Sequence, residues 1–482
     1  MIFTSIVFAL FFITVTILYY ILPTKFRWIW LLMSSIYFYV YAEPAYIFVA
    51  FAIICITFFA GKFMQNSSSK RAFNIYLFAL VLNISVLIFF KYINFFTTSL
   101  FDFLNFTRIN VFRSTNALNN TFLINIIAPL GISYITFQAI GYLIEIKRGN
   151  HAAENNFGYF ATFLLFFPKI IAGPVERAHH FLPQLNHLPN FNFNNISNGL
   201  KLILWGLFKK LVIADRLSLY VSAVLGNAEH HSSISLITAV IFYVFQMYAD
   251  FSGYTDMALG FAKILGFDLM PNFNRPLLAK SVTEFWRKWH ISLSTWFADY
   301  FYNPIAILKR DWGKWSVVYA SFVTFIVLGF WHGANWTFIV FGALQGFILT
   351  TEFFTRKVRK NFRKKIPELI NTLVGIVFTI SYFGFSLMFF RAKNLHQAFN
   401  IIKRIFTAKG DLYIGNLSII LFSVLGILFL ILFEVKKEYF NKQFTFSNNR
   451  NWLVRNIYYC LLLFIILIAG VFDGGEFIYF QF

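Results

Sequence analysis

Long apolar segments recur along the whole chain, and they limit most strongly what it can fold into. Each approaches the ~20 residues that a helix needs to cross a lipid bilayer. The segments lie near residues 3–22, 28–42, 46–61, 73–92, 122–144, 158–172, 199–222, 233–265, 315–330, 336–354, 368–390, 412–433 and 454–472. Several are short or interrupted, so the sequence predicts an all-α, polytopic membrane protein with roughly 11 to 13 membrane helices.

Composition excludes an ordinary soluble protein, because 59% of the 482 residues are hydrophobic and only 13% are charged. No linker rich in Ser, Gly or Pro divides the chain, so we expect one membrane domain over residues 1–482. The first apolar segment has no basic stretch before it and no good cleavage site after it, which predicts a retained span. Cys55 and Cys460 lack metal-ligand spacing, and we expect neither a metal site nor a bound cofactor.

The formal net charge of +21 gathers at the ends of the apolar segments, most densely in Arg356–Lys365. Positively charged loops favour the cytoplasm, and anionic headgroups attract such runs. We therefore predict contact with membrane lipids and not with nucleic acid. Alternation from a cytoplasmic Arg356–Lys365 places both chain ends outside. The same alternation puts the basic loop 391–411 outside, against the charge rule.

Two Trp-His steps, Trp289-His290 and Trp331-His332, lie in this apolar sequence. Ionisable side chains at membrane depth are costly and often mark chemistry, and histidine moves protons near neutral pH. His332 lies between two predicted helices, with Asn335 placed to cap the second. A hydrogen-bonded core histidine and a catalytic one both remain open for each position.

The segment Phe245–Ala258 places two carboxylates, Asp250 and Asp256, in an apolar run. Such groups cannot face lipid unpaired, so they line a cavity or pair internally. On the helix predicted here, Gln246 and Gly253 share a face with Asp250. An internal hydrogen-bond network is the first interpretation of these residues, and direct participation in catalysis stays open.

The segment Trp286–Trp296 repeats tryptophan at helical spacing, while Arg287, His290 and Ser294 fall on another face. It carries too many charges for a spanning helix. We expect an amphipathic helix that lies at the interface or re-enters the protein.

A third polar insertion, Phe167–Arg177, contains Pro168 and a Gly-Pro turn that predict a helix end. Glu176 and Arg177 follow it at the membrane boundary. They are either charges at a helix terminus or contacts to substrate.

Together these motifs resemble the membrane-bound O-acyltransferase family, and most closely its bacterial alginate O-acetyltransferase branch. The resemblance rests on four segments in the same order along the chain, and it extends over nearly all of it. The segments are Ala172–Arg177, Gln246–Asp256, Phe285–Ser294 and Phe330–Gly333.

The resemblance implies a helical fold around a central funnel open to the cytoplasm, with the catalytic core at approximately 170–340. It implies that His332 is the core catalytic histidine and that His290 is the second functional one, able to orient the thioester or polarise its carbonyl. It further implies acetyl-CoA as acyl donor, passage of the acyl group through the bacterial inner membrane, and SGNH-type extracytoplasmic acetyltransferases as partners that modify an exported polysaccharide.

The C-terminal segment 473–482 resembles a hydrophobic motif of this branch, which implies an extracytoplasmic acyl relay through Tyr479. A phenol, with pKa ~10, is easier to activate than a sugar hydroxyl. From the residues alone, anchoring of this aromatic segment at the membrane interface is the competing interpretation.

The other polar and aromatic side chains of the motifs are candidates for substrate contacts. These are Tyr248, Asp250, Ser252, Trp286, Arg287, Trp289, Trp331 and Asn335.

The sequence therefore favours a membrane O-acyltransferase, because the four motifs together indicate this family although any one of them alone would be weak evidence. The acceptor stays open between alginate, peptidoglycan and teichoic acid, the last by D-alanyl transfer. A transporter or flippase that uses the same polar residues as a relay, and a scaffold without catalysis, are the alternatives of other classes.

Overall fold

The computed structural model describes residues 1–106, 129–171, 173–440, 451–472 and 477. Throughout these residues the regular structure is helical and contains no β-strand. The N-terminal elements are α1 (Ile6–Ile21), α2 (Thr24–Ala42), η1 (Pro44–Tyr46), α3 (Ile47–Gln65), α4 (Ser69–Leu87), η2 (Ile88–Tyr92) and α5 (Ile93–Phe106).

The middle of the chain carries both long and very short helices. These are α7 (Ile132–Arg148), α8 (Phe157–Leu165), α9 (Phe167–Ile170), α10 (Ala178–Asn186), α11 (Phe193–Leu207), η3 (Phe208–Ala214), α12 (Asp215–Leu225), η4 (Ala228–His230), α13 (Ser233–Ile264), η5 (Pro276–Leu278), α14 (Val282–Lys288), α15 (Ile291–Phe297), η6 (Ala298–Tyr302) and α16 (Asn303–Leu308).

The last third of the chain consists mostly of long helices. They are α17 (Lys314–His332), preceded by η7 (Arg310–Trp312), then α18 (Trp336–Phe354), α19 (Arg356–Arg363), α20 (Glu368–Arg391), α21 (Leu395–Thr407), α22 (Leu417–Tyr439) and α23 (Trp452–Ala469).

In the described part of the chain, eight helices are long and apolar enough to cross a membrane. They are Pro44–Gln65, Ser69–Phe101, Ser233–Ile264, Lys314–His332, Trp336–Phe354, Glu368–Arg391, Leu417–Tyr439 and Trp452–Ala469. This confirms an all-α polytopic protein, with fewer such helices than the roughly 11 to 13 expected from apolar runs. The run 158–172 illustrates the difference, because the chain leaves helical geometry at Phe166 and divides the run between α8 and α9.

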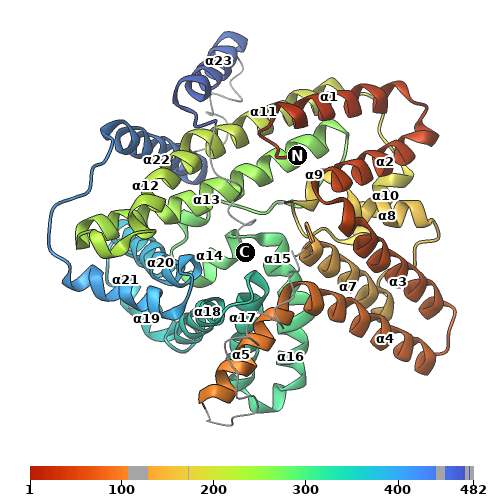
Figure 1. Cartoon of the computed structure of the whole chain (residues 1–482), viewed down its shortest axis with the longest axis horizontal. Helices are drawn as coiled ribbons and strands as arrows, with labels where there is room; N and C mark the ends of the chain where they lie inside the picture. Colours follow the sequence, from red (N-terminus) through yellow and green to blue (C-terminus); the bar gives the residue numbers. More distant parts are fainter. Residues whose placement is uncertain (107–128, 172, 441–450, 473–476, 478–482) are drawn as a thin grey trace.

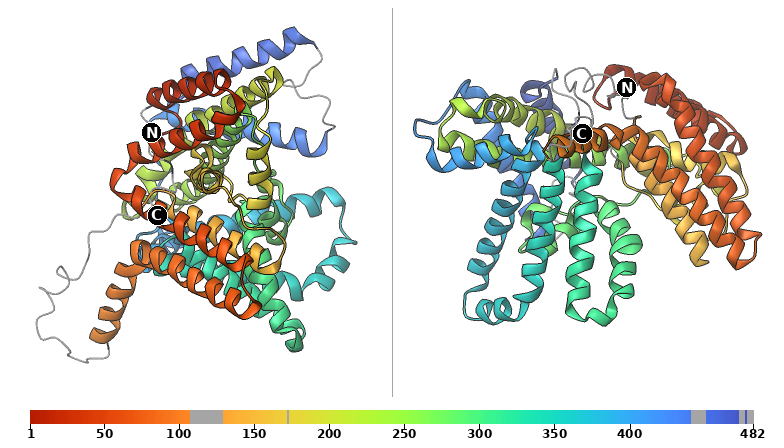
Figure 2. Two further views of the ribbon diagram at one scale, coloured as in Figure 1. Left: turned by 90° about the vertical axis from the view of Figure 1, so that its right-hand side faces the viewer. Right: turned by 60° about the horizontal axis from the view of Figure 1, so that its bottom comes forward.

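Short helices occupy the centre of the molecule, and long helices surround them. Figure 1 shows α14 and α15 in the middle, between α13 on one side and α17 and α18 on the other. Figure 2 shows the α3–α4, α16–α17 and α18–α19 connections at one end of the molecule. The α20–α21 connection lies at the opposite end. The α3–α4 and α18–α19 connections, both predicted to be cytoplasmic, thus lie at one end, and which end faces the cytoplasm stays a prediction.

Glycines allow two pairs of long helices to cross with their backbones in close approach. A Cβ atom on Gly206 of α11 would lie 2.5 Å from the carbonyl oxygen of Gly253 on α13. At the crossing of α17 and α18, a Cβ atom on Gly329 would clash with the carbonyl oxygen of Phe338. Small residues at such crossings permit the tight packing that holds membrane helices together.

The basic loop 391–411 forms α21, an amphipathic helix at the end opposite Arg356–Lys365. Arg404 donates hydrogen bonds to the main-chain carbonyls of Ala228 and His231. Because this guanidinium binds the neighbouring loop of the same chain, its charge serves packing. That role gives a physical reason for a basic loop which opposes the charge rule.

Candidate active site

His332 is the last residue of α17, where the helix gives way to an extended Gly333. Asn335 then caps α18, since its side chain accepts a hydrogen bond from Thr337 N at 3.0 Å. The ring of His332 is buried, with ring centroids 4.8 Å from Trp331 and 5.1 Å from Phe390. The helix break predicted from the sequence is confirmed, and it holds the imidazole inside the protein.

His290 lies at a break that the sequence did not predict. The expected single helix over Trp286–Trp296 is two helices, α14 and α15, and His290 joins them with a positive φ of 43°. A non-glycine residue in this left-handed region is uncommon and persists only where the surroundings fix it. The break turns the buried ring towards α7, α13 and α17.

The rings of both histidines lie close to one indole. The ring centroid of Trp331 is 4.8 Å from that of His332 and 6.4 Å from that of His290. Tyr134 of α7 completes a triangle, at 5.9 Å from Trp331 and 6.5 Å from His290. Tertiary packing therefore brings together two histidines that are 42 positions apart in the chain (332 minus 290).

Three polar atoms in this triangle are buried without a hydrogen-bond partner among the described residues. They are Tyr134 Oη, His290 Nε2 and Trp331 Nε1. An unsatisfied buried polar group costs about 1–3 kcal/mol, and native proteins bury few of them. Such atoms in a native protein bind either an ordered water or a bound molecule, so these three are candidates for contacts to substrate.

Lys91 is a residue of this site that the sequence analysis missed. It lies in η2, a π-helical turn, and its ammonium donates to the carbonyl oxygens of Trp331, at 2.7 Å, and His332, at 3.3 Å. A cation is favourable at a helix C-terminus, where carbonyls lack partners. Lys91 thereby holds the end of α17. A lone lysine inside the apolar run 73–92 was the available signal.

A cavity of about 1170 Å³ lies between α14, α15, α17, α18, α19 and α20. Neither histidine lines it, but Ile291, next to His290, and Leu328, one turn before His332, do. Its other end is strongly basic. The basic lining residues are Lys280, Arg287, Arg356, Arg359, Lys360, Arg363 and Lys364.

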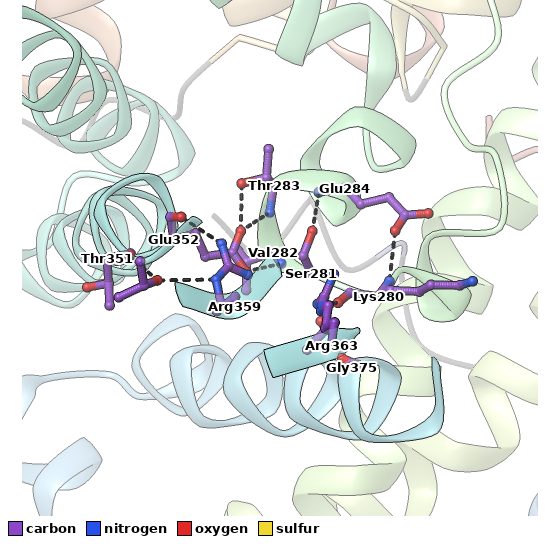
Figure 3. Close-up of polar contacts among 12 residues, drawn as sticks. Lys280, Ser281, Val282, Thr283, Glu284, Thr351, Glu352, Arg359, Arg363 and Gly375 are labelled. Carbon is purple, nitrogen blue, oxygen red and sulfur yellow. Dashed lines mark hydrogen bonds and ion pairs between the residues drawn. The ribbon is translucent and has the colours of Figure 1, made fainter. Parts of the chain in front are cut away.

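The wall of the cavity is tied together by Glu352 of α18 (Figure 3). Its carboxylate accepts hydrogen bonds from the backbone N–H groups of Val282 and Thr283 and from the Thr283 hydroxyl. Arg359 of α19 pairs with the same carboxylate at 3.4 Å. An anion at a helix N-terminus is favourable, so Glu352 fixes α14 against the corner of α18 and α19.

The carboxylates of α13 form ion pairs with two buried lysines of η3. Lys210 lies 2.8 Å from Asp250 and 2.8 Å from Asp215, while Lys209 lies 2.5 Å from Asp256. Lys209 also donates to Ser252 at 2.9 Å. Removing one partner of a buried pair typically costs 3–5 kcal/mol. The internal network is therefore the role that these contacts support for Asp250 and Ser252.

The remaining sequence candidates divide between the cavity and the packed interior. Trp286 and Arg287 line the cavity. Trp289 packs against Phe285, with ring centroids 5.3 Å apart, and Tyr248 donates its hydroxyl to Glu434.

The charges after the Gly-Pro turn are bound within the protein. Arg177 pairs with Asp299 at 3.0 Å. The Glu176 carboxylate binds His180 at 2.9 Å, and this contact raises the pKa of that imidazole. These contacts support the interpretation of both residues as charges that hold a helix terminus in place.

The C-terminal segment reaches the same site through its one described residue. Tyr479 and the rest of 473–482 lie outside the described residues, except Phe477. Phe477 is buried, with its ring centroid 4.4 Å from Tyr254 and 5.9 Å from Phe251. Phe251 in turn lies 4.7 Å from His290.

Comparison with known proteins agrees with this arrangement. The family model of the membrane-bound O-acyltransferases (MBOAT) matches residues 150–391, which include both histidines. The chain belongs to the membrane-bound O-acyltransferase family. It is thus a multi-pass membrane acyltransferase, as the motifs predict.

Several relatives in this family cover most of the chain. The chain is 33% identical to "Probable alginate O-acetylase AlgI" of Azotobacter vinelandii, over 87% of this chain and 80% of that protein. It is 32% identical to a peptidoglycan O-acetyltransferase of Helicobacter pylori, over 78% of this chain and 73% of that protein. A teichoic acid D-alanyltransferase of Bacillus subtilis is 28% identical over 57% of this chain and 71% of its own length.

Proposed function

We propose that this membrane O-acyltransferase takes an acetyl group from acetyl-CoA at its cytoplasmic side and passes it across the membrane for O-acetylation of an exported polysaccharide such as alginate. One observation carries the proposal: Ile291 and Leu328, which are chain neighbours of His290 and His332, line a cavity that also carries seven basic side chains. The names of the relatives support the class of acceptor.

The cavity suits a donor that has a thioester at one end and phosphates at the other. Basic side chains at its outer end, such as Arg356 and Lys360, complement phosphate groups. The inner wall is more apolar, with Phe325 and Leu328 from α17. A donor that lies along this cavity would present its acyl group near the histidines, and exclusion of water would limit hydrolysis.

His332 acts as general base in the proposed reaction. It takes the proton of an attacking hydroxyl, whose oxygen forms a bond to the thioester carbonyl carbon. The carbon–sulfur bond then breaks, and the leaving thiolate receives the proton from the imidazole. A positioned base of this kind contributes ~10²–10⁴-fold to the rate.

Tyr479 is proposed to carry the acyl group between the membrane enzyme and an SGNH-type partner outside. Burial of Phe477 against Tyr254 supports this role, because it brings the chain two positions before Tyr479 into the neighbourhood of Phe251 and His290. A buried Phe477 favours the relay over simple anchoring of the tail at the interface.

Purified protein tests the proposal directly. Detergent-solubilised wild type, given acetyl-CoA, is expected to release free CoA thiol in a manner that depends on His332. Transport without acyl turnover would support the transporter alternative. Unchanged turnover after substitution of both histidines would support a scaffold. Mass spectrometry of envelope glycans with and without the protein identifies the acceptor, including peptidoglycan or teichoic acid.

The proposed placement of the basic side of the cavity in the cytoplasm leads to a second expectation. In a chain whose Cys55 and Cys460 are replaced by serine, Lys360→Cys should resist an impermeant maleimide added to intact cells, since a cytoplasmic α19 is shielded by the membrane. Lys409→Cys is the matched control and should react, because Lys409 is exposed just after α21, a segment predicted to lie outside. Labelling of Lys360→Cys from outside would reverse the direction of transfer.

A further inference from the structure

Asn272, in the segment before α14, binds the backbone around His290. Its main-chain carbonyl accepts a hydrogen bond from Ile291 N at 2.8 Å, and its side-chain oxygen accepts one from Ser292 N at 3.4 Å. The Asn272 side chain is fully buried. These contacts on the two residues after His290 explain how the left-handed conformation of that histidine is maintained.

The hydrogen bonds around Ser292 establish which end of the Asn272 amide faces it. Val175 N–H donates to Ser292 Oγ at 2.9 Å, so the serine hydroxyl has its own hydrogen to donate elsewhere. That hydrogen goes to Asn272 at 2.5 Å, and Ser292 N–H points to the same atom. Two donors require an acceptor, so this atom is the amide oxygen and not the nitrogen.

The same oxygen decides which nitrogen of His290 carries the proton. Asn272 Oδ1 lies 3.3 Å from His290 Nδ1. An amide oxygen only accepts, so Nδ1 must be the donor and hold the proton. Burial lowers the pKa of His290 to about 3, so the ring carries a single proton near neutral pH. Nε2 therefore presents a lone pair, and it is buried without a partner among the described residues.

We infer that Asn272 is the positioning residue of His290: it fixes the Nδ1-protonated tautomer, so that Nε2 accepts a hydrogen bond from an O–H or N–H group of the substrate. A neutral imidazole in this tautomer has no hydrogen to offer at Nε2. It therefore cannot polarise the thioester carbonyl by donation, which was one of the two roles expected for His290. The inference rests on the proposed acyl-transfer site and specifies what that site binds.

The surroundings of His290 define how its protonation can change. The titratable side chains whose rings lie near it or near Trp331 are Tyr134 of α7 and His332 of α17. From α13 it meets the apolar ring of Phe251. Among the described residues, Lys91 is a cation near this pair, and its ammonium binds the main-chain carbonyl of His332 at the end of α17. No carboxylate contacts His290 among the described residues, so introducing one at position 272 is a specific perturbation.

Two substitutions at this position separate tautomer control from packing. Asn272→Leu removes the acceptor, and we expect kcat/KM for thiol release from acetyl-CoA to fall by about 100-fold or more at every pH. Asn272→Asp keeps the acceptor oxygen and loses only Nδ2, which has no partner among the described residues. A carboxylate beside an imidazole raises its pKa.

The aspartate variant should therefore show a new pH dependence. It is expected to approach wild-type kcat/KM at pH ~9 and to lose activity as the pH falls towards ~6, because protonated Nε2 cannot accept a hydrogen bond. Wild type should show no such loss from His290. Ser292→Ala should have a smaller effect than Asn272→Leu, since the Ser292 N–H still faces Asn272 Oδ1.

Asn83→Leu is the matched control. Asn83 is also fully buried, but it donates to Thr57 and to the carbonyl of Ala79, away from either histidine. This variant should lower the thermal stability in detergent and leave the pH profile of turnover unchanged. A shift in its pH profile like that of Asn272→Asp would make the effect one of general packing and overturn the inference.

Two results at position 272 would also overturn the inference: wild-type kcat/KM in Asn272→Leu, or a wild-type pH profile in Asn272→Asp. If Asn272→Leu does not fold, the aspartate profile alone decides. If wild type releases no thiol from acetyl-CoA, the proposed donor is wrong. The positioning role is then judged by the ester content of envelope polysaccharide in cells, where Asn272→Asp must exceed Asn272→Leu.

Discussion

His332→Ala is expected to abolish detectable O-acetylation of the product polymer and to lower thiol release by ~10²–10⁴-fold, the contribution of a positioned general base. The buried imidazole lies at the end of α17, where Lys91 holds the helix terminus through main-chain carbonyls. Those bonds do not depend on the imidazole. Folding and membrane insertion should therefore persist, as measured by expression and by melting temperature in detergent.

Two further variants make the result on His332 specific. His332→Gln keeps most of the buried volume and should be as inactive as alanine, which excludes a cavity effect. His396→Ala, an exposed histidine of α21, should match wild type. Near wild-type ester content in His332→Ala would refute the assignment, whereas loss of folded protein in both His332 variants would indicate a structural role.

Tyr479→Phe should abolish acetylation of the polymer while the protein remains folded. In the proposed relay His332 takes the phenolic proton, the phenolate oxygen bonds to the acyl carbon, and the thiolate leaves with that proton. The acceptor hydroxyl then displaces the phenol, which regains a proton. Phenylalanine keeps the aromatic ring that anchoring needs and removes only the reacting oxygen.

The relay predicts an acetylated C-terminal peptide in wild type that mass spectrometry detects when the acceptor is absent, and its loss in Tyr479→Phe. Tyr41→Phe, an exposed tyrosine at the end of α2, is the matched control and should keep both signals. Unchanged polymer acetylation in Tyr479→Phe would eliminate the relay and leave interface anchoring as the role of the tail.

Much of the fold could be predicted because membrane helices satisfy their own backbone hydrogen bonds. Each apolar run then predicts a helix from local information alone. More spanning helices were predicted than the described residues contain, because some apolar runs have a local break, as at Phe166 between α8 and α9. The caps were also local: Asn335 begins α18 by binding Thr337 N, as its residue type suggested.

The candidate site could be predicted only in part. The two Trp-His steps marked His290 and His332, because polar groups in an apolar sequence are conspicuous. Lys91 and Asn272 were missed, although both contact this pair or its backbone. Their partners lie 241 and 18 positions away, and hydrophobic periodicity carries no information about such contacts.

The sequence by itself determined the class of this protein: an all-α membrane chain with two histidines in irregular, tryptophan-rich segments. Only the tertiary structure decided that both histidines share Trp331, and that His290 is held in a left-handed conformation beside Asn272. The physical reason is that helix formation depends on near neighbours, whereas the orientation of a buried imidazole depends on hydrogen bonds from distant parts of the chain.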